Sequence, residues 1–299
     1  MKHFYARVLG KLLGDGSISK SNDNYARLQF HHRIEDACWT EYCYQQLKDY
    51  IPFTPPKKRF STNPINHYFY FVRSRKSDII LELHERWYPN DGKKKIPFDL
   101  LERYMTEETL AWWYQDDGHL KIERNYPSRI ILGTYGFAVE ENEQMIQLLH
   151  NKFQLNFKRD GQNRLVLNDK YQTYHFLSLV DPWIQPCMKR KRNTYPLPKP
   201  LAQKPAIRLP KQIRLKAPTK DMNEALETLD DFFTNEKVDM HKVAKHFLPR
   251  TFPNIEKRHY QVRLTDANRK RLYTLQHYTG LTLSELATYC FTKKPSSDR

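Results

Sequence analysis

The apolar and polar positions in the first part of the chain follow a helical period in some segments and a strand period in others. The apolar run over residues 4–13 ends at Gly14-Asp15-Gly16, which predicts a buried helix that stops there. The segment 25–31 alternates polar and apolar residues, as a half-buried strand does. The elements predicted next are a helix over 39–50, a strand over 67–73 and a helix over 79–87.

The same order recurs further along the chain, so the sequence predicts a pseudo-two-fold protein. Thr106, followed by Glu107 and Glu108, is a helix start signal, and the helix that follows runs to Asp117-Gly118. The remaining predicted elements are a strand over 129–135, a helix around 145–153, a hairpin turning at 160–161 and a helix over 171–179.

The composition changes after residue 195, which marks a boundary. From Tyr195 to Pro218 prolines alternate with Lys and Arg, a composition typical of an extended basic linker rather than a packed element. A smaller module begins near Thr219. We therefore expect a first half over 1–98, a second half over 99–195, a linker over 196–218 and a mostly helical module over 219–299.

The charge of the chain indicates a polyanionic partner. Its 299 residues include 50 Lys and Arg against 34 Asp and Glu, a net charge of +16, and each cation set against a phosphate releases a condensed counterion. No apolar run approaches the roughly 18 residues of a membrane span, and no signal-peptide core forms before Gly14. We expect a nucleic-acid-binding protein of the cytoplasm or of an organelle, with neither a membrane nor a small-molecule cofactor as partner.

Four cysteines, Cys38, Cys43, Cys187 and Cys290, are scattered along the chain without a C-x-x-C pair. This spacing argues against a zinc site and against a disulfide framework. The cysteines are therefore expected to be reduced.

Two Asp-Gly pairs, Asp15-Gly16 and Asp117-Gly118, occupy matching places at the ends of apolar helices. A single such pair is a common turn signal, and two other Asp-Gly pairs in this chain are interpreted as plain turns. A carboxylate at a helix C-terminus faces the negative end of the helix dipole, which costs about 0.3–1 kcal/mol. Gly10 and Gly14 would let the two helices approach closely. A divalent cation relieves the resulting repulsion, and carboxylate and carbonyl oxygens suit Mg²⁺.

The segments Val8 to Gly16 and Leu110 to Gly118 resemble the two copies of the motif that names the LAGLIDADG homing endonucleases. Lys11 stands at a normally apolar motif position, and Trp112 stands where glycine is common in the wider family. Further matches, to the subgroup of the yeast mitochondrial omega-intron endonuclease, are residues 28–30, 55–58, 94–97, 151–156 and 186–188. The resemblance covers about residues 4–195.

The resemblance implies an α+β fold: a pseudo-two-fold αββαββα core with two DNA-facing β-sheets. It implies a site-specific DNA endonuclease that uses Mg²⁺, with Mn²⁺ as a substitute. The partner is double-stranded DNA with a long recognition site. The core is expected to work as a monomer, since its two halves supply both half-sites.

The resemblance also implies the residues of the site. The expected catalytic residues are Asp15, Asp117, Lys94, Lys191 and Gln29. The expected metal site consists of Asp15, Asp117, Gly14 and Asp116. Lys94 and Lys191 follow the two motif aspartates at nearly equal distances along the chain, which supports their assignment. The alternative for each lysine is a solvated phosphate contact among basic neighbours, and for Gln29 a simple base or phosphate contact.

The strand that starts at Tyr25 predicts a two-sided sheet. Arg27, Gln29 and His31 share one face while Leu28 and Phe30 share the other, so one side can face DNA while the other packs. The other residues expected on the DNA-facing surface are Lys57, Lys58, Arg59, Arg73, Arg75, Lys121, Arg124, Arg129, Lys158, Arg159 and Arg164. Any single one is more often a phosphate contact than a base reader.

The C-terminal segment resembles the ribbon-helix-helix DNA-binding motif over about 35 residues. Residues 258–264 alternate like a strand, a helix over 266–279 ends at Gly280, and Thr282 with Glu285 predicts a capping box for a second helix. The groove-reading places fall on His259, Gln261 and Arg263. The motif normally needs a second copy to complete its ribbon. The alternative is a small helical cap docked on the core.

A second class of function stays open, namely a non-cleaving nucleic-acid binder on the same fold, either an RNA maturase or a transcription regulator. The extra C-terminal module favours this reading. The presence of both Asp15 and Asp117 favours the endonuclease, because a protein that does not cleave has no need for two facing carboxylates.

Overall fold

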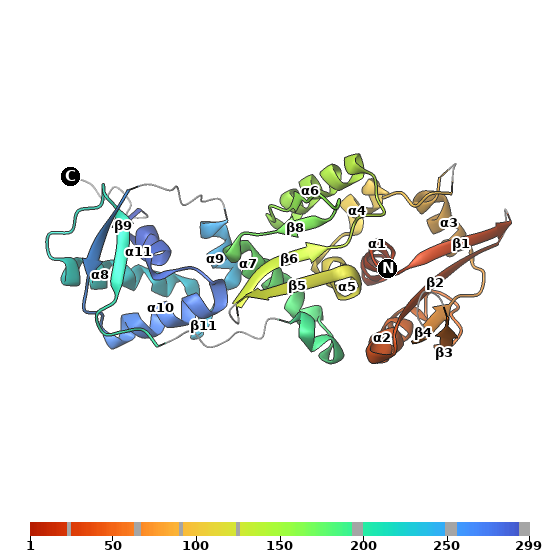
Figure 1. Ribbon diagram of the computed structural model, residues 1–299, viewed down its shortest axis with the longest axis horizontal. Coiled ribbons are helices and arrows are strands. Elements are labelled where there is room, and N and C mark those ends of the chain that lie inside the picture. The colour runs from red at the N-terminus through yellow and green to blue at the C-terminus, as the bar shows by residue number, and fades with distance from the viewer. Residues whose placement is uncertain are drawn as a thin grey trace. The chain divides into compact units, whose positions relative to one another are not determined.

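The computed structural model describes residues 1–22, 25–62, 67–89, 92–123, 126–192, 200–248 and 256–292. The chain divides into two compact units (Figure 1). Unit 1 consists of Met1–Ile122, Ser128–Asn168 and Phe176–Asn193, and unit 2 of Glu123–Pro127, Asp169–His175 and Thr194–Arg299. Among the described helices, none combines the length and the apolar character that crossing a bilayer requires.

Unit 1 is α+β and repeats one element order, which confirms the predicted αββαββα core. The first half contains α1 (Lys2–Leu13), β1 (Ser17–Asn22), β2 (Tyr25–Arg33), α2 (Ala37–Leu47), β3 (Lys57–Ser61), β4 (His67–Arg73) and α3 (Asp78–Trp87). The second half begins with α4 (Phe98–Tyr104) and continues with α5 (Glu107–Asp117), β5 (Gly118–Glu123), β6 (Tyr126–Leu132), α6 (Val139–Phe153), β7 (Lys158–Arg159), β8 (Leu165–Leu167) and α7 (Lys170–Val180). The end of β5, the start of β6 and the first part of α7 belong to unit 2. Short 3₁₀ turns include η3 (Pro186–Lys191).

Each half of unit 1 forms a four-stranded sheet, with strand orders β1-β2-β4-β3 and β5-β6-β8-β7. Along β2 the buried residues alternate with accessible ones, so Leu28 and Phe30 pack inward while His31 is exposed. The strand expected over 129–135 is β6, which ends earlier, because the Gly133 N–H donates to the carbonyl of Asp117 instead of to the sheet.

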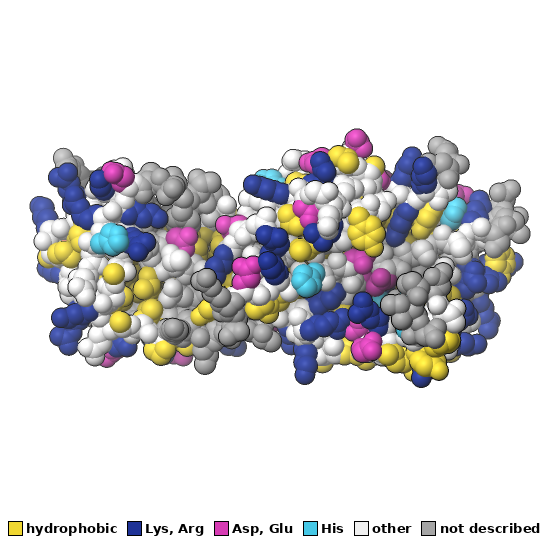
Figure 2. All heavy atoms as spheres, viewed as in Figure 1, with side chains coloured by type: hydrophobic (Ala, Val, Ile, Leu, Met, Phe, Trp, Pro, Cys, Tyr) yellow, Lys and Arg dark blue, Asp and Glu magenta, His cyan; other side chains and the backbone are white. Residues whose placement is uncertain are grey.

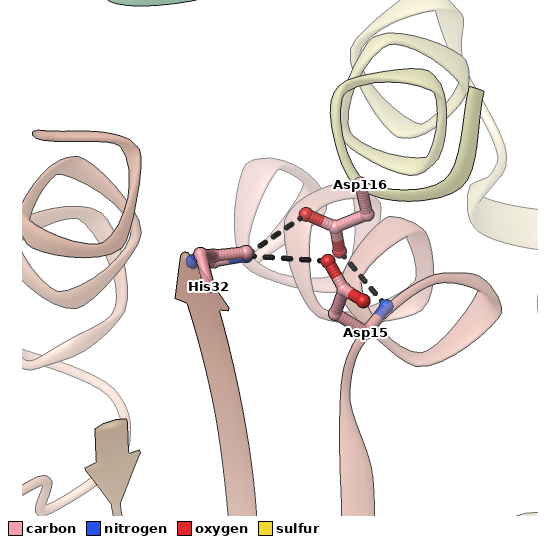
Figure 3. A group of neighbouring side chains, drawn as sticks. All are labelled: Asp15, His32 and Asp116. Carbon is pink, nitrogen blue, oxygen red and sulfur yellow. Dashed lines mark hydrogen bonds and ion pairs between the residues drawn. The ribbon is translucent and has the colours of Figure 1, made fainter. Parts of the chain in front are cut away.

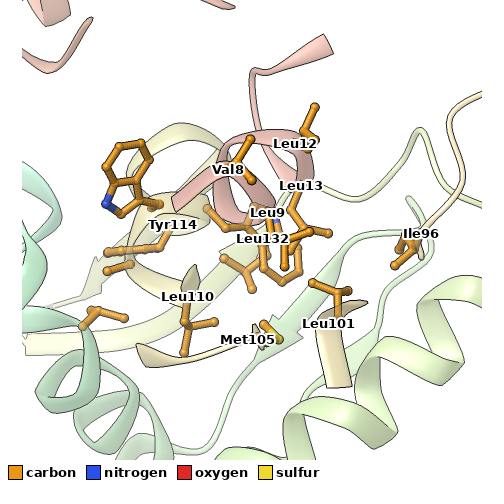
Figure 4. Close-up of a cluster of buried hydrophobic side chains, with 14 of the residues drawn as sticks. Val8, Leu9, Leu12, Leu13, Ile96, Leu101, Met105, Leu110, Tyr114 and Leu132 are labelled. Carbon is orange, nitrogen blue, oxygen red and sulfur yellow. The ribbon is translucent and has the colours of Figure 1, made fainter. Parts of the chain in front are cut away.

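Helices α1 and α5 pack side by side in the core of unit 1 (Figure 4). A Cβ at Gly10 would lie 2.6 Å from the carbonyl oxygen of Thr109, and a Cβ at Gly14 would lie 2.5 Å from the Cβ of Asp116. The two helices therefore approach closely, as expected, and they can do so because Gly10 and Gly14 have no side chain. Buried residues around the two helices include Val8, Leu9, Leu12, Leu13, Leu110, Tyr114 and Leu132.

The expectation of four reduced cysteines is wrong. Cys38, at the start of α2, and Cys187, in η3, form a disulfide with their Cα atoms 6.5 Å apart. Cys43 and Cys290 are free and buried. The pair is separated by 149 residues, so spacing along the sequence does not reveal a contact that folding of the two halves creates.

Unit 2 is mostly helical and contains a two-stranded antiparallel sheet. The sheet pairs β9 (Ala206–Pro210) with β12 (Lys257–Gln261). The other elements are α8 (Pro218–Leu226), η4 (Glu227–Phe232), β10 (Phe233–Thr234), β11 (Lys237–Val238), α9 (Met240–Phe247), α10 (Asp266–Thr279) and α11 (Leu283–Thr292). The helix signals near the C-terminus are confirmed, since α10 ends at Gly280 with a φ of 68° and Thr282 and Glu285 form reciprocal hydrogen bonds.

The expected linker 196–218 is partly a packed element. Ile207 and Leu209 of β9 are fully buried, because the apolar residues between the basic ones and the prolines fall on one face of a strand. Residues 193–199, where this linker begins, lie outside the described residues. The strand of the ribbon-helix-helix resemblance pairs with β9 of the same chain, where we expected a second copy to be needed.

Candidate active site

The ends of α1 and α5 reach the wall of a cavity of about 530 Å³ in unit 1. Asp15 lies two residues beyond α1, and Asp116 and Asp117 are the last residues of α5. His32 of β2 and Lys191 of η3 also line this cavity. The two motif copies therefore bring three carboxylates from two helix ends to one place.

The side chain of Asp116 is the centre of a buried network (Figure 3). Its Oδ1 accepts hydrogen bonds from Lys11 Nζ at 2.7 Å and from Trp39 Nε1 at 2.8 Å, and it lies 3.2 Å from His32 Nε2. Its Oδ2 accepts the backbone N–H of Asp15 at 3.2 Å. A carboxylate from the second half thus fixes the backbone of Asp15 in the first half.

Lys11 neutralises Asp116. Both side chains are 0% exposed and lie in contact. Burial opposes the charge of Asp116, but Lys11 and His32 together hold the pKa of its carboxyl well below the usual range. Burial likewise opposes the charge of Lys11, and Asp116 outweighs it, so the pKa of Lys11 is raised. Burial lowers the pKa of His32 to about 4, which leaves the imidazole neutral at pH 7.

This network does not suit a divalent cation. Ligand atoms of Asp15, His32 and Asp116 lie within 4.8 Å of one another, which is a possible metal spacing. The Lys11 ammonium, however, already lies 3.1 Å from His32 Nε2 and contacts Asp116. It supplies the positive charge that a metal would bring.

The carboxyl groups of Asp15 and Asp117 are less well compensated by positive charge than that of Asp116. Burial, followed by the charge of Asp116, raises the pKa of both carboxyls, that of Asp117 to about 6. In the part of the chain that the structure describes, neither forms an ion pair with Lys or Arg; the nearest basic group is His32, 3.5 Å from Asp15. Two under-neutralised carboxylates on a cavity wall are oxygen ligands that fit Mg²⁺.

Two lysines lie near the two helix ends, Lys191 buried and Lys94 half-buried. Lys94 Nζ donates to the carbonyl of Gly16 at 2.8 Å. Lys191 Nζ donates to the carbonyls of three residues in the last turn of α5, including that of Asp116 at 3.1 Å. Burial lowers the pKa of both lysines to about 8. Lys191 sets positive charge against the negative end of the α5 dipole, and Lys94 contacts the backbone just beyond α1, next to Asp15.

Residues 6–172 match the sequence profile of the LAGLIDADG DNA endonuclease family. The chain belongs to this family. Uncharacterized protein MJ1098 of Methanocaldococcus jannaschii is 32% identical over 189 residues, which cover 61% of this chain and 70% of that protein. Probable intron-encoded endonuclease 1 of Wickerhamomyces canadensis is 29% identical over 193 residues, covering 62% of this chain and 81% of that protein.

A solved structure of the homing endonuclease I-WcaI bound to its DNA recognition sequence has the same fold. It is 28% identical with a TM-score of 0.56, and the match covers 64% of this chain and 86% of that chain. The α+β LAGLIDADG fold inferred from the two motifs is therefore confirmed.

In this LAGLIDADG chain, the predicted DNA-facing residues of the first half lie on or next to its sheet. Lys57, Lys58 and Arg59 of β3 are exposed, and so is Arg75 beyond β4. Lys58 lies over the ring of Tyr68 and Arg59 over that of Phe71. Of the other four, Arg27 contacts the hydroxyl of Tyr25, Gln29 and Arg73 donate to serine hydroxyls of β1 at 3.4 Å, and His31 packs against Phe69.

In the second half, two of the predicted DNA-facing cations are ion-paired. Arg159 is ion-paired with Glu143 at 3.1 Å, and Arg164 with Asp160 at 2.7 Å. The other described residues of this set are Lys121 on β5, Arg129 on β6 and Lys158 on β7. Arg124 lies outside the described residues.

The sequence alone did not reveal three members of the Asp116 network, namely Lys11, His32 and Trp39. The available signal was Lys11, a charged residue within an apolar motif, which requires a buried partner. His32 falls on the inward face of β2, where alternation predicts packing. Asp116 was expected to bind metal. In the structure its carboxylate accepts a hydrogen bond from Lys11, and its backbone carbonyl accepts one from Lys191.

Proposed function

We propose that this LAGLIDADG protein is a homing endonuclease of the omega-intron type, which cuts both strands of double-stranded DNA at a long recognition site. The observation that carries the proposal is the pair Asp15 and Asp117, two carboxylates at the ends of paired helices that contact no Lys or Arg among the described residues. Lys94 and Lys191 beside them complete a site suited to phosphodiester hydrolysis. The relatives include a probable intron-encoded endonuclease and a homing endonuclease bound to its recognition sequence, which supports the proposal.

Asp15 and Asp117 would hold Mg²⁺, with Mn²⁺ as a substitute, and the cation would polarise the scissile phosphate and its attacking water. The carboxylates must be ionised for this role. Because the pKa of Asp15 is raised to about 8 and that of Asp117 to about 6, we expect cleavage to fall as the pH drops through this range. Gln29, on the accessible face of β2, is positioned to hydrogen-bond water or a base.

The two lysines provide positive charge where negative charge develops. With pKa values near 8, Lys94 and Lys191 are mostly protonated at pH 7. Their carbonyl partners hold the ammonium groups in place beside Asp15 and Asp117, so little reorganisation is needed during the reaction.

The exposed cations of the two sheets would contact the DNA backbone on both sides of the cut. Lys and Arg side chains are widespread on the face of unit 1 seen in Figure 2, with Asp and Glu between them. Since one chain supplies both sheets, we propose that the protein works as a monomer. Its affinity for DNA should then fall steeply with salt.

A cleavage assay with matched aspartate variants tests the proposal. The substrates are a plasmid carrying the joined sequences that flank the gene and a pool of plasmids with randomised inserts. We expect double-strand cutting with Mg²⁺ and none with EDTA. Asp15→Asn or Asp117→Asn should abolish cutting but change DNA affinity by less than about tenfold, or 1.4 kcal/mol, whereas Asp49→Asn, an exposed residue outside the cavity, should cut normally.

Full-rate cutting by either site variant would reject the assignment of these carboxylates. Absence of cutting with both Mg²⁺ and Mn²⁺, together with tight binding of intron RNA, would instead support the maturase alternative.

A further inference from the structure

Unit 2 contains a two-stranded ribbon with an accessible polar face. β9 and β12 pair in an antiparallel register that sets Arg208 opposite His259 and Ala206 opposite Gln261. Among the described residues neither strand pairs with a further strand. In the described part of the chain this sheet is therefore two strands wide.

The two faces of the ribbon differ in chemistry. The inner face holds Ile207, Leu209 and Tyr260, all buried in the hydrophobic cluster of unit 2. Helix α11 packs against β9, and α8 packs against β12. The outer face holds Arg208, His259 and Gln261, which are all exposed. The inner face thus packs on the helices, which fixes the outer face toward solvent.

The outer face and its surroundings are basic. Lys257 and Arg258 at one end of β12 and Arg263 just past its other end are exposed. Neither strand contains an Asp or Glu, and the neighbouring Glu256 is ion-paired with Lys211. Lys, Arg and His side chains gather over β9 in Figure 2.

The backbone in and next to the ribbon is fixed by hydrogen bonds from two N–H groups to neighbouring hydroxyl groups. The Arg208 N–H donates to the Ser284 hydroxyl at 3.0 Å, and the Arg263 N–H donates to the Thr219 hydroxyl at 3.4 Å. Across the described residues, no hydrogen bond or ion pair engages the side chains of Arg208, His259, Gln261 or Arg263.

We infer that the outer face of the β9–β12 ribbon is a second DNA-binding surface, which enters the major groove of duplex DNA and does so with a single chain. The major groove is wide enough to admit a two-stranded ribbon, and Arg and Gln are the side chains that pair bidentately with guanine and adenine there. His259, Gln261 and Arg263 were expected to face DNA from the sequence. Arg208 joins them from the opposite strand, so the ribbon needs no second copy.

The test measures how the affinity of the full-length protein for a random-sequence 30-bp duplex depends on salt, in EDTA. Each cation that neutralises a phosphate contributes about 0.9 to the slope of log affinity against log salt. On random-sequence DNA these two arginines contact phosphates, so Arg208→Gln with Arg263→Gln should reduce the slope by about 1.8. The matched control, Lys237→Gln with Lys245→Gln, removes two exposed charges on β11 and α9 and should leave the slope unchanged.

A second variant separates base reading from charge. His259→Ala with Gln261→Ala should keep the slope but broaden the sequences selected from a random duplex pool. Circular dichroism melts identify any variant that is unfolded. If the Arg variant is unfolded, Arg208→Lys with Arg263→Lys replaces it and must keep the slope while broadening the selected sequences.

Equal slopes for the ribbon and control variants, or an effect on duplex RNA but not on duplex DNA, would overturn the inference. The assay contains no divalent cation, so failure of the proposed endonuclease activity leaves its outcome unaffected.

Discussion

The three aspartates at the ends of α1 and α5 lie close together but differ in charge balance because only Asp116 contacts a lysine. Its partner Lys11 is fully buried, and Trp39 adds a further hydrogen bond. Asp15 and Asp117 have no such partner among the described residues and keep raised pKa values. One acid is therefore structural, and the other two are available for a cation.

Replacing Lys11 by Met should strongly destabilise the protein, because it leaves the buried carboxylate of Asp116 without its cation. We expect the free energy of unfolding to fall by about 3–5 kcal/mol, measured by urea denaturation. The double variant Lys11→Met, Asp116→Asn should recover most of this loss, since a neutral amide needs no ammonium. A Lys11→Met protein as stable as the wild type would contradict the ion-pair account, as would a double variant no better than the single one.

Replacing Asp117 by Asn should stabilise the metal-free protein at pH 7.5. The pKa of Asp117 is raised to about 6 in the folded protein, so the native state binds its proton more tightly than the unfolded state does. Its contribution to stability therefore falls as the pH rises from about 4 to about 6 and stays low above that. We expect a gain of about 2 kcal/mol in EDTA at pH 7.5 that disappears below pH 4.

Thermal melts between pH 4 and pH 8 measure this difference. Mg²⁺ should raise the melting temperature of the wild type more than that of Asp117→Asn. If the melting temperatures of the wild type and of Asp117→Asn depended on pH in the same way, folding would not raise the pKa of Asp117.

At the scale of elements, the pattern of the sequence identified those strands and helices that bury one face. It missed β1, β3 and β5, and β3 shows why, since all but one of its residues are exposed and no apolar alternation marks it. It missed β9 because prolines and basic residues dominate the composition around Ile207 and Leu209. It identified Asp15 and Asp117 from the motif, but not their relation to Asp116, which depends on contacts between residues about 100 positions apart.

The close packing of α1 on α5 predicts a specific sensitivity at Gly14. A Cβ there would lie 2.5 Å from the Cβ of Asp116, and both atoms belong to packed segments that cannot readily move. We expect Gly14→Ala to lower the free energy of unfolding by about 1–3 kcal/mol and to reduce cleavage by displacing Asp116. Gly136→Ala is the matched control, because nothing lies within 4 Å of its added Cβ. Equal stability of the two variants would refute the contact.

At the scale of the whole molecule, the Cys38–Cys187 disulfide joins the first half of unit 1 to η3 after the second half and closes a loop of 149 residues. A disulfide that closes a longer loop removes more conformational entropy from the unfolded chain. Replacing both cysteines by Ser should lower the free energy of unfolding by about 3–5 kcal/mol. Dithiothreitol should lower the melting temperature of the wild type and leave that of the variant unchanged. A wild-type melting temperature insensitive to the reductant would show that the bond does not stabilise the fold.

The fit of Gly14 against Asp116 makes the two halves non-interchangeable, because the two residues hold matching positions in the two motif copies. A symmetric homodimer of the first half would set Gly14 against Gly14 and bury two copies of Lys11 without an acid. A homodimer of the second half would oppose Asp116 with Asp116 and Trp112 with Trp112. We therefore expect that neither half forms a stable homodimer by itself, and that a chimera which takes one half from a relative must keep Lys11, Gly14 and Asp116 matched across the contact of α1 with α5.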